Sequence, residues 1–228
     1  MQEERQTKLS NEIIFNLFRE YNVTDIKFLM SIINRLLTRY KALENAKVEE
    51  NIDILEIGIS IDFLKKYKGK KNLTLNEMLD ITKKISSFGI LVIEGDDYRR
   101  INVFKEITYN ERYKSIKAIF NDSVMDYIVL INDNFTLIDL NEIKDLSSKY
   151  ELGLYLLVQM FKKTGVILKS IDSLKKYFMM KCDNKILFNN LRIAALKLND
   201  KFNYNIKIEY EKQGRKIDKV IIKFKKEV

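Results

Sequence analysis

The sequence predicts an α+β protein of two domains, and three features of the chain support this fold class. Apolar residues in the segment 184–202 recur at spacings of three and four, as expected for an amphipathic helix. In residues 206–224, apolar and polar side chains alternate on both sides of a turn at Gly214, as expected for a β-hairpin. Helices followed by a hairpin also occur in the first half of the chain. Because a helix that leads into a basic hairpin is typical of a winged helix-turn-helix, we expect two tandem winged-helix domains.

The first expected domain comprises residues 1–134. Thr74 and Glu77 are spaced as a capping box, which predicts the start of a helix, and Gly89 is expected to end it. The domain is expected to start with a frayed end (1–12), two helices (12–21 and 24–43), a strand (52–59) and a short helix (60–68). The capped helix (74–88), a hairpin (90–107), a strand (115–120) and a helix (123–131) are expected to follow.

The second expected domain comprises residues 135–228, and the polar run 132–134 is the predicted boundary. Ser170 is expected to cap a short helix. The expected elements are two helices (140–150 and 152–163), an extended piece (166–169), the capped helix (170–178), a long helix (184–202) and a hairpin (206–226). In the hairpin, the side chains expected on the core face are Ile206, Ile208, Tyr210, Val220, Ile222 and Phe224.

Composition excludes several classes of enzyme. The chain has no histidine and one cysteine, Cys182, which excludes zinc sites built from His or Cys and catalysis by a histidine base. Asp96 and Asp97 are adjacent carboxylates, but paired aspartates are common in hairpin turns. The seven glycines are scattered and form no phosphate-binding loop. We therefore expect no catalytic activity, no metal site and no cofactor.

The cellular compartment is predicted from the same composition. A single cysteine permits no internal disulfide, which favours a reducing environment. No apolar run approaches the ~18 residues that span a bilayer. The polar start MQEERQTKLSNE differs from a signal peptide. We expect a cytoplasmic protein with no membrane contact.

The positive charge is concentrated in the second half of the chain. Residues 1–134 carry 21 Lys and Arg against 21 Asp and Glu, whereas residues 135–228 carry 20 against 11. From residue 184 onward, 12 basic residues stand against 5 acidic ones. An AT-rich genome would raise the lysine content evenly along the chain, and the observed distribution is uneven. The sequence therefore predicts that the second half binds a polyanion.

Short motifs in the second half occur in a fixed order. They are Ser148-Lys149-Tyr150, Leu154-Tyr155, Lys163-Thr164-Gly165, Leu174 with Lys175, Asn199 and Gly214-Arg215-Lys216. With these motifs, the segment 135–226 resembles the C-terminal domain of the Rep initiator proteins of iteron-containing plasmids. Residues 1–134 resemble that family only in length and element order. Two positions depart from its pattern, since Gly153 replaces a common arginine and Ile193 replaces a common proline of the recognition helix.

The resemblance implies a function in DNA replication. Proteins of this family have two winged helices and bind repeated double-stranded DNA sites, the iterons, at a plasmid origin to start replication. They also repress their own genes as dimers. The resemblance therefore implies a homodimer in equilibrium with the monomer, and host replication proteins as further partners.

Candidate DNA-binding residues are assigned to two roles. Arginine can bridge guanine O6 and N7, and asparagine can pair with adenine, so the polar face of the long helix is expected to provide sequence readout. Its residues are Lys185, Asn189, Asn190 and Arg192. Residues of the short helix and the hairpin tip are expected to contact phosphates. These are Ser170, Lys175, Lys176, Lys212, Arg215 and Lys216.

The first domain is expected to contribute weaker DNA contacts and a surface for dimerisation or a host factor. Its helix over residues 74–88 begins with Asn76, Glu77 and Asp80, and acidic groups that face phosphates are unfavourable. The auxiliary candidates are Lys70, Lys71, Lys83, Lys84, Arg99 and Arg100.

Two other functions are compatible with parts of the sequence. One is a winged-helix transcriptional regulator, which would bind a single inverted site in place of tandem repeats. The other is a metal-dependent nicking enzyme of the rolling-circle type. Such enzymes normally hold their metal with histidine, and this chain has none.

Overall fold

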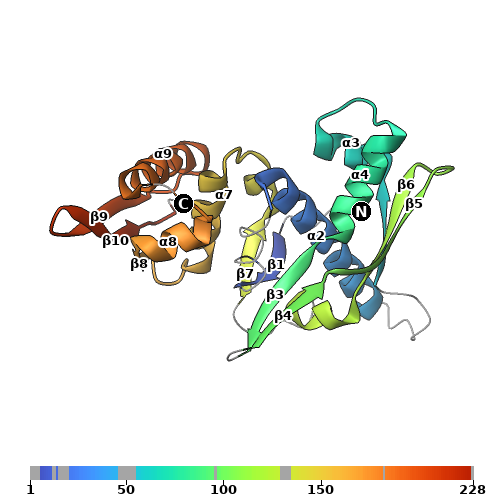
Figure 1. The fold of residues 1–228 in the computed structure, drawn as a ribbon, viewed down its shortest axis with the longest axis horizontal. Helices are drawn as coiled ribbons and strands as arrows, with labels where there is room; N and C mark the ends of the chain where they lie inside the picture. The colour runs from blue at the N-terminus through green and yellow to red at the C-terminus, as the bar shows by residue number, and fades with distance from the viewer. Residues whose placement is uncertain are drawn as a thin grey trace.

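The chain forms an elongated α+β molecule with its C-terminal elements at one end (Figure 1). This computed structural model describes residues 6–11, 14, 21–45, 55–94, 97–128, 135–181 and 183–226. Four features discussed above lie wholly or mainly outside these residues. They are the helix expected over residues 12–21, the turn residue Asp96, the boundary run 132–134 and Cys182.

The first half contains a long helix, α2 (Val23–Asn45), which lies within two residues of the predicted bounds. The capping box is confirmed, because Thr74 accepts a hydrogen bond from the Glu77 amide and the Thr74 amide donates to the Glu77 carboxylate. The other elements described are β1 (Gln6–Ser10), β2 (Glu56–Ser60), α3 (Ile61–Lys68), α4 (Leu75–Ser86), β3 (Gly89–Glu94), β4 (Asp97–Asn102), β5 (Phe104–Asn110), β6 (Ser115–Phe120), the 3-10 turn η1 (Asp122–Val124) and α5 (Met125–Ile128).

The second half follows the predicted order, but it begins with a strand that was not predicted. Its first helix is shorter than predicted, and its second helix is shifted by three residues towards the N-terminus. Its elements are β7 (Phe135–Asp139), α6 (Leu140–Lys144), α7 (Lys149–Met160), β8 (Val166–Ser170), α8 (Ile171–Phe178), α9 (Asn184–Phe202), β9 (Lys207–Gln213) and β10 (Lys216–Lys223). Helix α6 ends early because Leu146 turns into the core and Ser148 starts α7 as its N-cap. The predicted cap at Ser170 is confirmed, since its hydroxyl accepts a hydrogen bond from the Ser173 amide.

The hairpin predicted over residues 90–107 is wrong in its second strand. Strand β4 ends at Asn102, and the following residues form β5, which belongs to a different sheet of order β2-β6-β5. The break occurs at Val103, whose amide donates to Phe88 and whose carbonyl accepts from Asn121. Phe104 is then buried against Phe120, with ring centroids 4.8 Å apart. These contacts redirect the chain, and alternation of apolar residues alone could not reveal them.

The expectation of a frayed N-terminal end is also wrong for part of that segment. Strand β1 pairs antiparallel with β7, in the register Gln6↔Asp139 to Ser10↔Phe135. The pairing joins residues on the two sides of the predicted boundary. Pairing between segments so far apart in the chain leaves no local pattern in the sequence. The short run QTKLS is also too polar to predict a strand.

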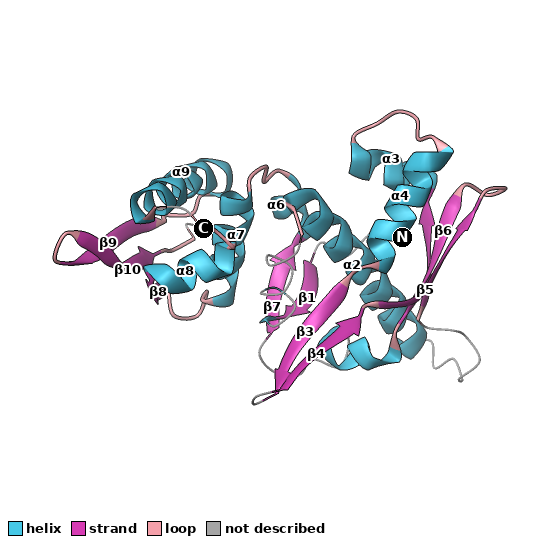
Figure 2. Cartoon of the chain, in the orientation of Figure 1, coloured by secondary structure: helices cyan, strands magenta, loops and turns pink. Residues whose placement is uncertain are grey.

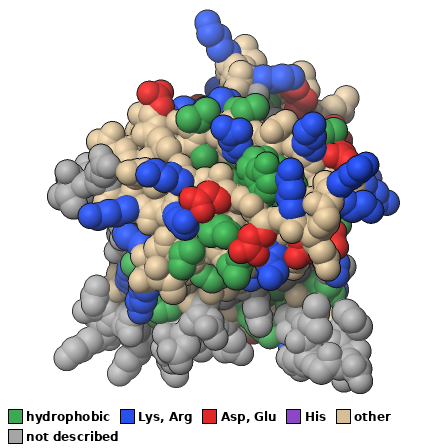
Figure 3. Space-filling view, turned by 90° about the vertical axis from the view of Figure 1, so that its left-hand side faces the viewer, with side chains coloured by type: hydrophobic (Ala, Val, Ile, Leu, Met, Phe, Trp, Pro, Cys, Tyr) green, Lys and Arg blue, Asp and Glu red, His purple; other side chains and the backbone are tan. Residues whose placement is uncertain are grey.

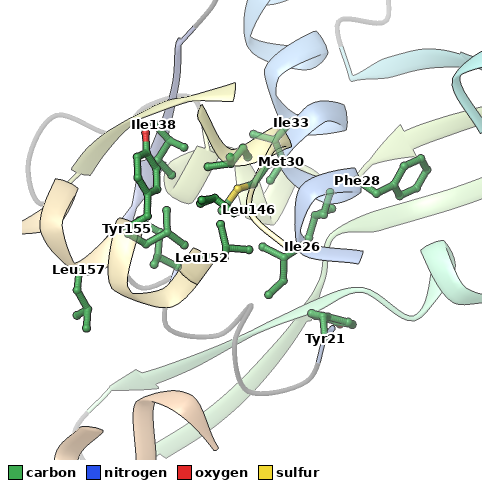
Figure 4. Packing of buried hydrophobic residues seen from close by; sticks show 14 of the residues in the cluster. Tyr21, Ile26, Phe28, Met30, Ile33, Ile138, Leu146, Leu152, Tyr155 and Leu157 are labelled. Carbon is green, nitrogen blue, oxygen red and sulfur yellow. The ribbon is translucent and has the colours of Figure 1, made fainter. Parts of the chain in front are cut away.

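A hydrophobic cluster is continuous between the two halves. Helix α2 contacts β1 and α6, and the close-up in Figure 4 shows its Ile26, Met30 and Ile33 on the side of Leu146 and Leu152. The side chains at this contact include Ile26, Met30, Ile33, Ile138, Leu146, Leu152 and Tyr155. All are buried, so this interface orients the C-terminal elements relative to α2.

The C-terminal sheet has the order β8-β10-β9, and α8 and α9 lie beside it (Figure 2). Strands β9 and β10 are joined at Gly214, which has a φ of 63° and therefore takes a conformation that favours glycine. Burial decreases along the hairpin towards this turn. Ile206 is buried and Ile208 is half-buried, whereas Tyr210 is exposed, so the predicted core face stops before the tip.

Gly153 is required by the packing of α8 against α7. A Cβ atom added at Gly153 would lie 2.3 Å from Cε1 of Phe178, which is fully buried. Alanine normally stabilises a helix interior relative to glycine by up to ~1 kcal/mol. Here we expect Gly153→Ala to lower the free energy of unfolding by about 1–3 kcal/mol, because the site is overpacked. Denaturant unfolding measures this loss.

Two further variants separate overpacking from a general effect of substitution. In a Phe178→Leu background, Gly153→Ala should cost less, because the clashing ring atoms are absent. Gly58→Ala is a matched control, since no atom lies within 4 Å of its added Cβ. A Gly153→Ala variant more stable than the parent would contradict the packing argument.

Candidate nucleic-acid interface

Helix α9 is amphipathic and presents its polar side to solvent. Asp183 caps it by accepting a hydrogen bond from the Lys185 amide at 2.7 Å. Its buried residues are Leu187, Phe188, Leu191, Ala194, Ala195 and Leu198. Of the residues predicted to read DNA, Lys185, Asn189 and Arg192 are exposed and Asn190 is half-buried. The structure therefore places this predicted set outside the core.

The buried carboxylate of Glu151 holds α9 against α7. Glu151 is 1% exposed, and its Oε1 lies 2.7 Å from Nζ of Lys197, while its Oε2 accepts the Ser147 amide at 3.0 Å. Lys201 lies 3.8 Å from the same carboxylate. Burial raises the pKa of Glu151, but the hydrogen bonds from Lys197 and Ser147 outweigh burial and lower the pKa to about 2. Two lysines of α9 thus stabilise the helix position.

Two contacts connect α9 to the hairpin. Asn184 donates from Nδ2 to the carbonyl of Ile217 on β10 at 3.0 Å. The ring of Phe188 packs edge-on against Tyr210 of β9, with centroids 4.7 Å apart. The Arg192 guanidinium lies 6.0 Å from the Phe188 ring, and Lys212 lies 5.5 Å from the Tyr210 ring. The helix and the hairpin therefore present cations on adjoining surfaces.

The hairpin has different charge environments at its base and its tip. Near the base, Lys223 pairs with Glu209 across the strands at 2.7 Å, and closer to the tip Lys219 lies 3.8 Å from Glu211. The tip carries Lys212, Arg215 and Lys216, all exposed. Within the part of the chain that the structure describes, none of these three forms an ion pair. The cations of the tip are consequently more available to a phosphate than those nearer the base.

The candidates on α8 have mixed environments. The Ser170 hydroxyl caps α8 and lies 2.8 Å from the Ser173 hydroxyl, so its hydrogen-bonding capacity is used within the helix start. Lys175 is half-buried and Lys176 is exposed, both in the last turn. Lys176 is the better placed of these three to contact a phosphate.

Several auxiliary candidates of the first half are engaged within the protein. Lys84 pairs with the buried Asp25 at 2.7 Å, and Lys70 pairs with Glu77 at the start of α4. Arg100 donates from Nη2 to the Ser87 carbonyl at 3.0 Å. Lys71, Lys83 and Arg99 are exposed. Three of the six auxiliary residues, Lys84, Lys70 and Arg100, thus make contacts within the protein.

Three outward side chains of α9 are absent from the predicted DNA-binding residues. Ile186, Ile193 and Leu196 are large, apolar and exposed. All three lie off the buried stripe that the spacing of three and four defines. The sequence pattern could have identified them as exposed apolar residues on the same side as Asn189.

The described residues show neither a metal site nor a membrane span. No three or more Asp, Glu or Cys side chains among them gather to hold a metal ion. None of the described helices combines the length and the apolar composition that crossing a membrane requires.

The end of the molecule formed by α9 and the hairpin is rich in cations. Figure 3 shows this end, with Lys and Arg side chains spread over it and hydrophobic side chains among them. A polar helix face beside a basic hairpin is an arrangement that binds the DNA backbone and grooves. The fold and this surface define a DNA-binding protein.

The family follows from comparison with known sequences. The family described as "Initiator Replication protein, WH1" matches residues 6–159. The chain therefore belongs to this family of replication initiators, and the matched segment contains a winged-helix domain. None of the curated protein sequences matches the chain.

Solved structures show a related fold. The Pi initiator protein, whose structure was solved in complex with iteron DNA, has a TM-score of 0.68 and 18% identity, and 98% of each chain is covered. Domains 2 and 3 of RctB give a lower TM-score of 0.49 with 10% identity, and cover 91% of this chain and 83% of that one. The likeness to the Pi initiator protein extends the shared fold to almost the whole chain.

The Glu151 contact predicts a pH-dependent stability. Because its pKa falls from 4.5 to about 2, the stabilisation is present above pH 4.5 and is lost as the pH falls towards 2. We expect Glu151→Gln to lower the free energy of unfolding by about 2 kcal/mol at pH 7. Denaturant unfolding at several pH values should show this difference shrinking below pH 4.5.

An exposed ion pair supplies the control. Glu209→Gln removes the partner of Lys223, and both side chains are about half exposed, so its effect should stay below ~0.5 kcal/mol. Equal losses for the two variants, or a Glu151→Gln loss that persists at pH 2, would show that Glu151 does not hold α9 by its charge.

Proposed function

We propose that this protein starts plasmid replication by binding repeated double-stranded DNA sites, the iterons, at the origin. Membership of the initiator family supports the role in replication. The likeness to the Pi initiator protein, whose structure contains iteron DNA, supports the choice of ligand. The observation that carries the proposal is the cationic surface of α9 and the hairpin, which has the two parts that groove binding needs.

We also propose that the second half is a second winged helix, so that the fold consists of two in tandem, in residues 1–134 and 135–228. The order β8, α8, α9, β9, β10 supports this assignment, as does the pairing of β8 with β10. In the first half, β2, α3, α4, β3 and β4 follow one another in a similar order. The pairing of β1 with β7 then connects the two domains.

In the proposed mechanism the protein acts by binding alone. Asn189, Asn190, Arg192 and Lys185 read bases in the major groove, and the hairpin tip binds phosphates. The first domain adds weaker DNA contacts and the surface for a second copy or a host replication protein. A dimer represses the protein's own gene, and the monomer binds the origin in the cytoplasm.

Two substitutions distinguish readout from phosphate binding. Arg192→Ala should relax the preference for one base pair by about 1–3 kcal/mol. Lys216→Ala should weaken binding to all sequences alike and reduce the salt slope of the affinity by about one. Titrations of cognate and random duplexes at several salt concentrations measure both effects.

The control for these titrations is Lys223→Ala, since Lys223 is paired with Glu209 at the base of the hairpin. Its effect on affinity should be smaller than that of Lys216→Ala. Equal losses on cognate and random duplexes for both Arg192→Ala and Lys216→Ala would refute the two roles.

The number of binding sites separates an initiator from a transcriptional regulator. On DNA that flanks its own gene, an initiator should give a ladder of retarded bands, with one band for each repeat. A gel-shift titration measures this ladder. A single complex on one inverted site would favour the regulator.

A nicking assay tests the absence of catalysis. Supercoiled plasmid that carries the flanking DNA should stay supercoiled with the protein and Mg²⁺ or Mn²⁺. Conversion to the open circle by protein free of nucleases would overturn the proposal of a binding protein without catalytic activity.

A further inference from the structure

The outermost ridge of α9 is largely apolar. Ile186, Asn189, Ile193 and Leu196 follow one another at spacings of three, four and three, which places them in one row along the helix. The exposed fractions of Ile186, Ile193 and Leu196 are 52%, 53% and 68%. Leu196 is the most exposed large aliphatic side chain among the described residues. A row of apolar side chains exposed to this extent is unfavourable in water. It therefore indicates a surface that another molecule covers.

Charge beside the ridge indicates what covers it. On one side lie Lys185 and Arg192, and Arg192 is next to Phe188 and the hairpin. On the other side Lys197 is paired with the buried Glu151, so the available positive charge lies on the side of the hairpin. A protein partner would have to present an apolar surface beside these cations. The major groove of DNA fits more simply, because its floor carries base edges and its rims carry phosphates.

Base edges include one apolar group that such a ridge can recognise. The C5-methyl group of thymine projects into the major groove, and it is the only methyl group on the four unmodified bases. Asn189 stands within the same row and can pair with adenine N6 and N7. The row therefore combines a group for adenine with apolar groups for the thymines beside it.

We propose that Ile193 and Leu196 of α9 recognise thymine methyl groups, so that the repeated site has A·T base pairs facing this ridge. The inference rests on the proposed function and specifies the base pairs that this surface selects. Ile186 extends the same contact towards the start of the helix. In this arrangement Lys185 and Arg192 read bases beside the ridge, the hairpin tip contacts phosphates, and the apolar side chains add specificity.

Deoxyuridine tests the methyl contact directly, because it differs from thymidine only by the missing methyl group. The probe is the duplex that the full-length protein selects from a randomised library, with each thymine replaced in turn. At one or more positions the replacement should weaken binding about fourfold, which corresponds to ~0.8 kcal/mol for one buried methyl group. Fluorescence anisotropy titrations measure the affinities.

Variants assign the effect to the ridge. Ile193→Ala and Leu196→Ala should each bind the thymine duplex more weakly and should no longer distinguish thymine from deoxyuridine at one of those positions. Leu137→Ala is the matched control, since Leu137 is 51% exposed on β7, outside α9 and the hairpin. It should retain the full thymine preference.

The outcomes separate this inference from the proposed function. Selective binding that is insensitive to every thymine replacement would overturn the methyl contact and leave the initiator function standing. A thymine preference that persists in the Ile193→Ala/Leu196→Ala double variant would also overturn it. Failure to select any duplex would refute the proposed function itself.

Discussion

The position of α9 depends on one buried carboxylate. Glu151 lies on α7 with almost no exposure, and its charge is balanced by Lys197 and Lys201 of α9. A buried charge without a partner is costly, so the two helices are held in one relative position. Together with the buried apolar stripe of α9, this contact sets which side of the helix faces the core. The opposite side, with Asn189 and Arg192, remains available for DNA.

Ion pairs divide the lysine and arginine side chains of the protein into two groups. Lys84, Lys70, Lys197 and Lys223 each have a carboxylate partner within the chain. The three cations of the hairpin tip have no such partner among the described residues. Net charge alone therefore overstates the surface that can bind phosphates. The tip cations are therefore the ones that we propose to bind phosphates, and the contact between Phe188 and Tyr210 holds their hairpin beside α9.

Sequence reasoning succeeded where the signal is local. The capping residues Thr74 and Ser170 and the amphipathic α9 were predicted correctly, because caps and helical spacing depend on neighbours in the chain. It failed where distant segments pair, as in β1 with β7 and in β5 with β6. The exposed side of α9 could be predicted, whereas the roles of Glu151 and Tyr210 needed the tertiary structure. The family match covers mainly the first half, whose resemblance to the family was predicted from length and element order alone.

The central claim is that α9 lies in the DNA groove. Cys182 is the only cysteine of the chain and directly precedes Asp183, the residue that caps α9. An iron chelate attached to Cys182 generates hydroxyl radicals, which cleave DNA near the point of attachment. On DNA that flanks the gene, we predict cleavage inside each repeat that the protein protects. Labelled protein that still protects the repeats but cleaves none of them internally would contradict the claim.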